Sequence, residues 1–325
     1  MFSSVCLVRN KMNDSIHDNL LKIRQSIKKV MVCKEETLDL LLTSLLAKGH
    51  VLIEDVPGIG KTTLAKTLAN TMSLSFVRIQ FTPDIMPSDV TGFSMMDFSS
   101  NQFIFHEGLV MSQIVLADEI NRASPKTQSS LLEAMQENQV TVDGKSYELP
   151  KPFMVIATQN PVDFAGTYPL PEAQLDRFLM RINLGYPSIS DEVEIINRSE
   201  KDFTSDSIEE SASVEDVISL QESAFKVKSN HAIKEYIAML CSNTRSNRDI
   251  QMGASPRAAI ALNSASKAYA LLNKRDYVIP DDVQYLLKPI LSHRIVLKPE
   301  ARLRDMTQEL VLNNVLKAVQ VPGVQ

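Results

Sequence analysis

The sequence predicts an α/β protein in which short buried strands alternate with helices, followed by a region of helices only. The first observation is a set of apolar runs rich in β-forming residues, each bounded by turn or helix signals. The second is a glycine-containing turn between the first of these runs and a helix. The third is the change after Pro187, where helical spacing continues without strand signals. We therefore expect N-terminal helices and an α/β core in residues 1–187 and a helical domain in residues 188–325.

Composition limits the classes of function. The 325 residues suffice for one large domain or two modest ones, and 44% hydrophobic with 22% charged residues is ordinary for a soluble globular protein. A formal net charge of −5 gives no overall electrostatic case for nucleic-acid binding. The 3 cysteines are far apart, which favours a reducing compartment, and the 5 histidines form no zinc cluster. With no apolar run near ~18 residues and no signal-peptide layout, we expect a cytoplasmic protein without a membrane span.

The first part of the chain predicts helices. Apolar residues recur every three or four positions through residues 16–48, after a start at residues 1–15 that we expect to be a loose terminus. Gly49 ends this part, and the run His50–Ile53 is short enough for a buried strand. We expect His50 to be a packed or capping histidine rather than a metal ligand.

The stretch after this strand predicts a phosphate-binding loop. A helix follows it, in which Leu64, Leu68 and Met72 are four residues apart. Glycines permit a tight turn whose backbone N–H groups point at phosphate oxygens, and the helix N-terminus adds partial positive charge. A lysine adds a full charge, and the following threonine offers a hydroxyl to Mg²⁺. The nucleotide-binding candidates here are Pro57, Gly58, Ile59, Gly60, Lys61, Thr62 and Thr63.

One position departs from the usual pattern G-x-x-x-x-G-K-[ST]. Asp55 replaces its first glycine, while the groups that contact phosphate are kept. The alternative is a glycine turn that merely precedes a lysine. The motifs further along the chain favour nucleotide binding.

A second strand and two hairpins come next. The strand is predicted at Phe76–Gln80, where β-forming residues alternate with polar ones. Gln102–Gly108 looks like part of a hairpin, whose aromatic side chains either pack within it, which we favour, or face a partner. Asp143-Gly144 within Val140–Tyr147 is a two-residue hairpin signal.

Two acids end the third predicted strand, Ile114–Ala117. Asp118 and Glu119 would be costly to bury there without a cation or hydrogen-bond donors. In a phosphate-loop enzyme the first acid holds Mg²⁺, usually through water, and the second orients and helps deprotonate the attacking water. The alternative is a solvated pair that caps the next helix. Because Lys61 lies upstream, we favour the catalytic interpretation.

Two later strands place polar residues at the same edge. The fourth, Phe153–Ala157, is followed by Asn160, just past the carboxyl end, where open α/β sheets place their ligands. A side-chain amide there can position water against a terminal phosphate, although an Asn-Pro pair alone is simply a turn. A short helix leads to the fifth strand, Leu179–Leu184, and puts Arg177 on this edge.

The remaining chain predicts helices. Residues 199–216 are polar and acidic and predict a loop or linker. Ser255-Pro256 gives an N-cap followed by proline at the first helical position, and Arg257 falls in the first turn of that helix. A further helical stretch covers residues 281–293.

In this order and spacing, the motifs resemble those of the AAA+ ATPases, and their wording is similar to that of the MoxR family in the helix-2-insert group. The resemblance covers about residues 30–293 and rests on Glu54–Thr63, Asp118–Pro125, Ala157–Pro161 and Leu170–Phe178. It implies an AAA+ phosphate-loop core, with a five-stranded parallel sheet between helices, and a C-terminal all-helical lid domain.

The resemblance also implies a role for each candidate. Asp118 corresponds to the Mg²⁺-associated acid, together with the Thr62 hydroxyl, and Glu119 to the water-activating acid. Asn160 corresponds to sensor 1. Arg177 corresponds to the arginine finger, which in such rings reaches into the neighbouring site. Arg257 corresponds to sensor 2.

Other segments follow the family less closely. Val32 and Cys33 would lie near the adenine, in a stretch where the family typically has Val-Gly-Gln. Residues 93–105 and 140–147 correspond to the helix-2 insert and to the hairpin before sensor 1, thought to line the pore side of the ring. Residues 108–111 depart from the family's usual Gly-Pro-Ile-Phe.

The implied function is Mg²⁺-dependent ATP hydrolysis in a nucleotide-stabilised homo-oligomer, a hexameric ring, that remodels or matures partner proteins. Relatives are associated with chaperone-like maturation or metal-cofactor insertion, often with partners carrying von Willebrand A domains. Three alternatives stay open: a magnesium-chelatase-like motor subunit, a DNA-translocating motor and a non-hydrolysing ATP switch. Nucleic acid fits poorly because the candidate hairpin has only Lys145 against Asp143 and Glu148.

Overall fold

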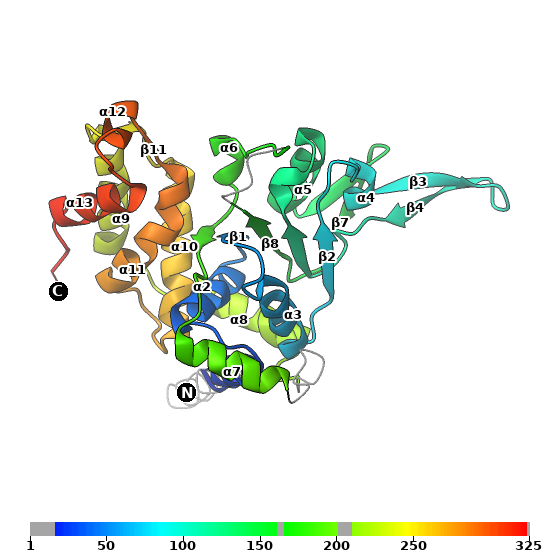
Figure 1. The fold of residues 1–325 in the computed structure, drawn as a ribbon, viewed down its shortest axis with the longest axis horizontal. Helices are drawn as coiled ribbons and strands as arrows, with labels where there is room; N and C mark the ends of the chain where they lie inside the picture. The colour runs from blue at the N-terminus through cyan, green and yellow to red at the C-terminus, as the bar shows by residue number, and fades with distance from the viewer. Residues whose placement is uncertain (1–16, 161–165, 201–209, 324–325) are drawn as a thin grey trace, which may run out of the picture.

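A five-stranded sheet forms the centre of the computed structural model, which describes residues 17–160, 166–200 and 210–323 (Figure 1). The strands lie in the order β2-β5-β8-β1-β9, and neighbouring strands are parallel. Their bounds are Val51–Glu54 (β1), Phe76–Gln80 (β2), Ile114–Asp118 (β5), Met154–Gln159 (β8) and Met180–Ile182 (β9). The predicted parallel sheet is confirmed, and the predicted strand ends are wrong by at most two residues.

Alternate residues of the central strands face two separate hydrophobic cores, because side chains in a strand point to opposite faces in turn. In β5, Ile114 and Leu116 join one core, and Val115 and Ala117 join the other. All four are fully buried. A strand buried on both faces has no polar face, so it appears in the sequence as a continuous apolar run.

Helices cover both faces of the sheet. One face is covered by the helix formed by residues 17–30, by α2 (Glu35–Leu46) and by α3 (Lys61–Thr71), whose apolar side chains enter the first core. The other face is covered by α5 (Pro125–Glu137), which brings Leu132 and its neighbours into the second core. Helix α5 buries one apolar stripe and leaves its polar face outside, whereas α2 is buried over most of its length, including Thr43 and Ser44.

His50 joins the sheet to α5. Its Nδ1 accepts the Val155 amide at 3.0 Å, and its Nε2 lies 3.0 Å from the Met135 carbonyl oxygen, to which it donates in that tautomer. Burial of the ring lowers the pKa of His50 to about 4. The prediction of a packed or capping histidine is confirmed in its first form, since His50 is buried.

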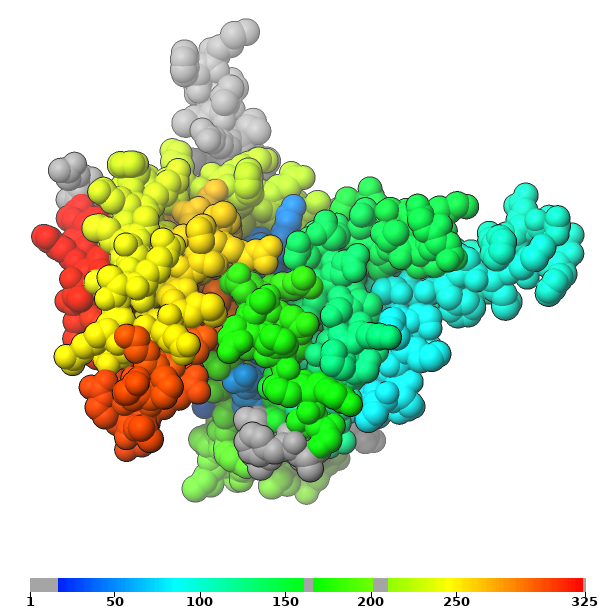
Figure 2. Space-filling view, turned by 90° about the horizontal axis from the view of Figure 1, so that it is seen from above, coloured from blue at the N-terminus to red at the C-terminus, as the bar shows by residue number. Residues whose placement is uncertain are grey.

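Two hairpins lie at one side of the sheet. They are β3 (Gly92–Asp97) with β4 (Gln102–Glu107), which follow α4 (Pro87–Thr91), and β6 (Gln139–Val142) with β7 (Lys145–Glu148). The β3–β4 ribbon extends away from the body of the molecule (Figures 1 and 2). Phe105 stacks on Tyr147 at 3.8 Å between ring centroids, as the packing interpretation expects. That interpretation is wrong for Phe103, which is 69% exposed.

The region after the sheet is mainly helical. Its helices are α7 (Ile189–Ser199), α8 (Val214–Lys226), α9 (His231–Ser246), α10 (Pro256–Leu272), α11 (Pro280–Leu291), α12 (Pro299–Arg302) and α13 (Gln308–Ala318). The prediction of helices alone needs one correction. A short antiparallel pair joins β10 (Ile250–Met252) to β11 (Val296–Leu297). Both strands are too short to show a period in the sequence.

The predicted linker at residues 199–216 is shorter than expected. Helix α8 begins at Val214, and its N-cap hydroxyl on Ser213 accepts the Asp216 amide at 3.2 Å, so residues 214–216 are helical. The middle of the linker, residues 201–209, lies outside the described residues.

The helical region and the sheet share the first core. That core runs from strand residues such as Ile156 through Leu41 of α2 to Leu262 of α10 and Leu286 of α11. A buried hydrogen bond adds to it, since Gln221 of α8 donates to the Leu45 carbonyl oxygen at 2.7 Å. Within the described parts of the chain, no helix has the length and apolar character to cross a membrane.

Candidate functional site

The candidate residues collect at the carboxyl edge of the sheet. Because the strands are parallel, β1, β5 and β8 all end at this edge, at Glu54, Asp118 and Gln159. The loop after β1 leads directly into α3, and the loop after β8 begins with Asn160. The carboxyl ends of these strands therefore lie where an open α/β sheet binds its ligands.

The loop between β1 and α3 has the geometry of an anion cradle. Gly58 and Gly60 have φ of +86° and +85°, in the left-handed region that favours glycine. Gly60 is the N-cap residue of α3, so the free amides of the first helical turn face the loop. A Cβ on Gly60 would approach the Met31 side chain to 3.2 Å. A helix N-terminus beside such a turn can bind phosphate.

Lys61 lies half-buried at the start of α3, and its Nζ donates to the Asp55 carbonyl oxygen at 2.8 Å. Burial lowers the pKa of Lys61. The carboxylates of Asp118, Asp55 and Glu119 act on this pKa in the opposite direction. The lysine of the loop after β1 and the two acids at the end of β5 therefore lie at the same edge of the sheet.

Asp118 is held by two side chains that the sequence did not suggest. The Thr158 hydroxyl donates to Asp118 Oδ1 at 2.6 Å, and the Arg78 guanidinium donates to Oδ2 at 2.7 and 3.1 Å. A carboxylate has about four acceptor lone pairs, so one remains for a cation or water beside these three bonds. The carboxylate of the neighbouring Glu119 has different partners.

Glu119 has an unusual backbone for a side chain of its size. Its φ is +56°, in the left-handed region, and its amide donates to Thr158 Oγ1 at 2.9 Å. Its Oε2 accepts from Gln80 at 3.0 Å and lies 3.1 Å from Arg122 Nε. Backbone strain of this kind costs about 1–3 kcal/mol and tends to occur where function fixes a residue's direction.

The donor set fits Mg²⁺ with a bound phosphate group. Thr62, half-buried in the first turn of α3, offers a hydroxyl oxygen, and Asp118 offers a carboxylate. Mg²⁺ takes few protein oxygens and keeps water and phosphate ligands. The described residues hold no group of three or more histidine, cysteine or acidic side chains suited to a metal on their own.

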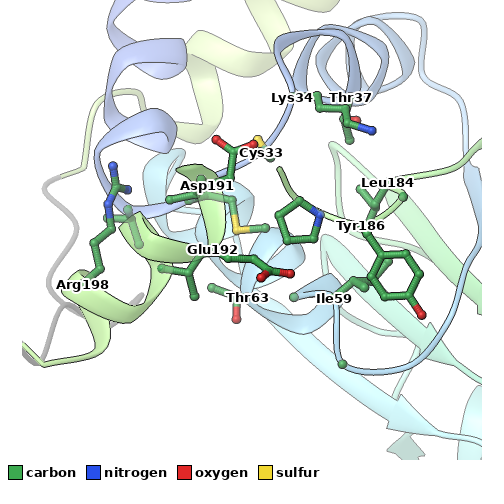
Figure 3. Close-up of a pocket in the computed structure, with 18 of the residues that line it drawn as sticks. Cys33, Lys34, Thr37, Ile59, Thr63, Leu184, Tyr186, Asp191, Glu192 and Arg198 are labelled. Carbon is green, nitrogen blue, oxygen red and sulfur yellow. The ribbon is translucent and has the colours of Figure 1, made fainter. Parts of the chain in front are cut away.

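A cavity of about 490 Å³ lies beside the loop. It is lined by sequence candidates Val32, Cys33, Pro57, Gly58, Ile59, Gly60 and Thr63, and by α7 residues that the sequence did not suggest, among them Asp191, Glu192 and Arg198. Figure 3 shows the α7 side chains on one side of this cavity, with Cys33, Thr63 and Tyr186 around it. Burial raises the pKa of the Cys33 thiol to about 11, so this cysteine acts as a small apolar lining residue.

Three other candidates lie outside this cavity. Asn160 is half-buried just after β8, Arg177 is half-buried between α6 (Glu172–Leu175) and β9, and Arg257 is exposed in the first turn of α10. None of the three lines the cavity. The structure thus brings the loop and the two acids to one edge, and places neither candidate arginine at the cavity.

The chain segments that carry Arg177 and Arg257 are nevertheless joined through Asp176. The carboxylate of Asp176 accepts from Arg294 Nε at 2.7 Å and from Ser255, the N-cap of α10, at 3.4 Å. Arg294 is 5% exposed and also donates to the Phe178 and Leu179 carbonyl oxygens, at 2.6 and 2.9 Å. The segment that carries Arg177 is therefore fixed to the lid.

Two family models match the chain. The model for the ATPase family associated with various cellular activities (AAA) matches residues 50–180, and the AAA lid domain model matches residues 242–314. "Uncharacterized protein YeaC" from Bacillus subtilis (strain 168) is 50% identical over 309 residues, which cover 95% of this chain and 97% of that protein. "Chaperone MoxR1" from Mycobacterium tuberculosis (strain ATCC 25618 / H37Rv) is 41% identical over 307 residues, 92% of this chain and 81% of that protein. The solved structure of a "putative ATPase" from Cytophaga hutchinsonii ATCC 33406 matches with a TM-score of 0.91 and 38% identity, covering 98% of this chain and 99% of that one.

The parallel sheet, the phosphate-loop geometry and the two model matches define an AAA+ ATPase with a helical lid. Within that class, the similarity to MoxR1 extends over most of both chains. The chain belongs to the MoxR family, and the resemblance found in the sequence is confirmed.

Proposed function

We propose that the protein hydrolyses ATP to ADP and phosphate in a Mg²⁺-dependent reaction. The observation that carries the proposal is the meeting of Lys61 and the α3 N-terminus with Asp118 and Glu119 at one edge of the sheet. Phosphoryl transfer needs positioning and charge stabilisation more than covalent chemistry, and this edge supplies both. The adenosine part would occupy the cavity lined by Val32 and Cys33.

Each residue has one task in this proposal. Lys61 and the α3 amides would hold the phosphates, and Thr62 and Asp118 would hold Mg²⁺, which would supply neutralisation of phosphate charge. Glu119 would orient a water molecule and accept its proton as the oxygen attacks the γ-phosphorus, while the bond from that phosphorus to the β–γ bridging oxygen breaks and ADP leaves. Asn160 positions the same water from the end of β8. The Thr158 hydroxyl fixes the Asp118 carboxylate and the Glu119 backbone relative to each other.

We further propose that the active unit is a ring of identical chains, a hexamer. Arg177 and Arg257 do not line the cavity of their own chain, which supports a site completed at a subunit boundary. Arg177 would act as the finger in the neighbouring site, and Arg257 would serve as sensor 2 from the lid. An arginine supplied in this way is worth about 10³–10⁵ in rate.

The work of the ring is the remodelling or maturation of partner proteins, with von Willebrand A domain proteins as the expected partners. The name of the chaperone MoxR1 supports this proposal by family likeness. We place the division between ATPase core and lid at residues 187 and 188, just before α7 begins at Ile189.

Phosphate release by the purified chain tests the proposal. We expect Mg²⁺-dependent turnover that EDTA removes, no ATP binding by Lys61→Ala, and ATP binding without turnover by Glu119→Gln. Glu119→Gln keeps the size and a hydrogen-bonding oxygen of the side chain while removing the base. Full turnover by Glu119→Gln would remove Glu119 from that role, and ATP binding without turnover by the unaltered chain at every concentration would leave a nucleotide switch.

A further inference from the structure

Asp55 connects the phosphate loop to the chain segment that leads into the lid. Its Oδ2 accepts the Gly185 amide at 2.7 Å, and its Oδ1 accepts the Val56 amide at 3.0 Å. The usual loop pattern has glycine at this position, and glycine has no carboxylate. The one departure from the pattern therefore forms the contact between the loop and residue 185.

Gly185 lies in the connection between β9 and α7, where the chain changes direction. It follows β9, precedes α7 and has φ of +67°, in the left-handed region. Gly185, Tyr186 and Pro187 line the candidate nucleotide cavity. A hydrogen bond to the Gly185 amide thus fixes the chain at the point where it leaves the sheet for α7.

Among the residues that the structure describes, few other contacts fix α7. None of its residues is buried, so it has no packed apolar face on the body. At its far end, Arg198 donates to the Lys28 and Lys29 carbonyl oxygens at 3.2 and 2.9 Å. Polar contacts near its two ends therefore set its position over the cavity, and one of them is Asp55.

The main chain of Asp55 contacts the phosphate-binding lysine and the end of β8. Its carbonyl oxygen accepts from Lys61 Nζ at 2.8 Å, and its amide donates to the Gln159 carbonyl oxygen at 3.2 Å. A lysine at this place in a phosphate loop binds the β- and γ-phosphates. A bound nucleotide therefore competes with the Asp55 carbonyl oxygen for Lys61.

We propose that Asp55 is a positioning residue that couples nucleotide in the loop to the position of α7 over the cavity. When a nucleotide binds, Lys61 leaves the Asp55 carbonyl oxygen for the phosphates. The Asp55 carboxylate meanwhile holds the Gly185 amide. The proposal rests on the ATPase function proposed above. It differs from a purely local role, in which Asp55 only stiffens the loop through Val56.

Restoring the usual pattern gives a direct test. Asp55→Gly creates G-x-x-x-x-G-K-T, so the loop keeps its phosphate contacts, and we expect the Kd for ATP to stay within about threefold. Asp55→Asn keeps one acceptor oxygen and should give an intermediate effect. The matched control is Asp305→Gly, because Asp305 is exposed, has φ of +55° and lies in a turn of the lid.

Two readouts separate coupling from loop stiffness. In a Glu119→Gln background, ATP should slow hydrogen exchange over residues 185–199, and Asp55→Gly should remove most of this protection although ATP is bound. In the otherwise unaltered chain, Asp55→Gly should lower kcat by about tenfold, as loss of a hydrogen bond to a charged group allows, with KM within about threefold. Asp305→Gly should change neither.

Equal protection and equal kcat in Asp55→Gly would overturn the coupling while leaving the ATPase function intact. Loss of ATP binding by more than about tenfold in Asp55→Gly would assign Asp55 to the loop alone and would also overturn it. Absence of ATP binding by the parent chain would instead overturn the proposed function, and the coupling with it.

Discussion

Thr158 contacts both Asp118, the last residue of β5, and Glu119, which follows it: its hydroxyl donates to Asp118 Oδ1 at 2.6 Å and accepts the Glu119 amide at 2.9 Å. Thr158 is 1% exposed, in the strand next to these acids. One buried hydroxyl thereby fixes the direction of a carboxylate and the strained backbone of its neighbour.

Thr158→Val should therefore impair chemistry more than binding. Valine has nearly the same shape but neither donates to Asp118 nor accepts from Glu119. We expect kcat to fall about tenfold or more, since a hydrogen bond to a charged group is worth about 1.5–3 kcal/mol, with the KM for ATP nearly unchanged. Steady-state phosphate release measures both. Thr158→Ser, which keeps the hydroxyl, should stay within about threefold, and an unchanged kcat in Thr158→Val would contradict the assigned role.

Arg177→Ala should bind ATP but hydrolyse it about 10³-fold more slowly at any protein concentration, because the finger stabilises charge in the transition state. Mixing it with Lys61→Ala protein should restore part of the activity. In a mixed ring, an intact loop on one subunit meets an intact Arg177 on the next. The double variant Lys61→Ala/Arg177→Ala is the matched control and should restore nothing. Equal activity in the two mixtures would argue against action across a subunit boundary.

Arg294→Met should destabilise the fold by about 3 kcal/mol, because it leaves the Asp176 carboxylate and several carbonyl oxygens at the lid without their donor. Urea unfolding measures the change in the apparent free energy of unfolding. Arg248→Met is the control: this side chain is 86% exposed, with a 3.7 Å ion pair to Asp249, and its loss should cost under about 0.5 kcal/mol. Similar effects of the two variants would mean that the Arg294 contacts add little.

Acid should weaken the fold through His50. Burial lowers its pKa to about 4 from 6.5, so between these pH values the unfolded chain binds a proton that the folded chain excludes. Stability is then complete above pH 6.5 and falls as the pH drops towards 4, by about 3 kcal/mol for this residue. Urea unfolding at a series of pH values measures the slope. His50→Gln cannot titrate and should show a shallower slope over the same range, and an identical slope would exclude His50 as its source.

Much of the site could be predicted because parallel strands deliver their carboxyl ends to one edge. Asp118, Glu119 and Asn160 each follow an apolar run, so their shared edge follows from the strand pattern alone. The glycine turn before Lys61 also depends only on local geometry. The fold class and these candidate residues can therefore be predicted from patterns within short stretches of the chain.

The partners of those residues could not be predicted, because they depend on strand register and on contacts far apart in sequence. Arg78 and Gln80 reach the acids since Gln80 pairs with Asp118 across β2 and β5. The bond from Asp55 to Gly185 spans 130 positions. The sequence marks Asp55 as a departure from the glycine pattern, whereas its carboxylate contact with the Gly185 amide is visible only in the structure.

The shared first core has a consequence for how the chain can be divided. Side chains of the sheet, of α2 and of the lid helices belong to one continuous apolar cluster. A fragment ending after β9 would expose Leu41 and Leu45 of α2, which are 0% and 1% exposed in the full chain. The ATPase core and the lid therefore stabilise each other, and cutting between them would yield two aggregation-prone fragments rather than two working domains.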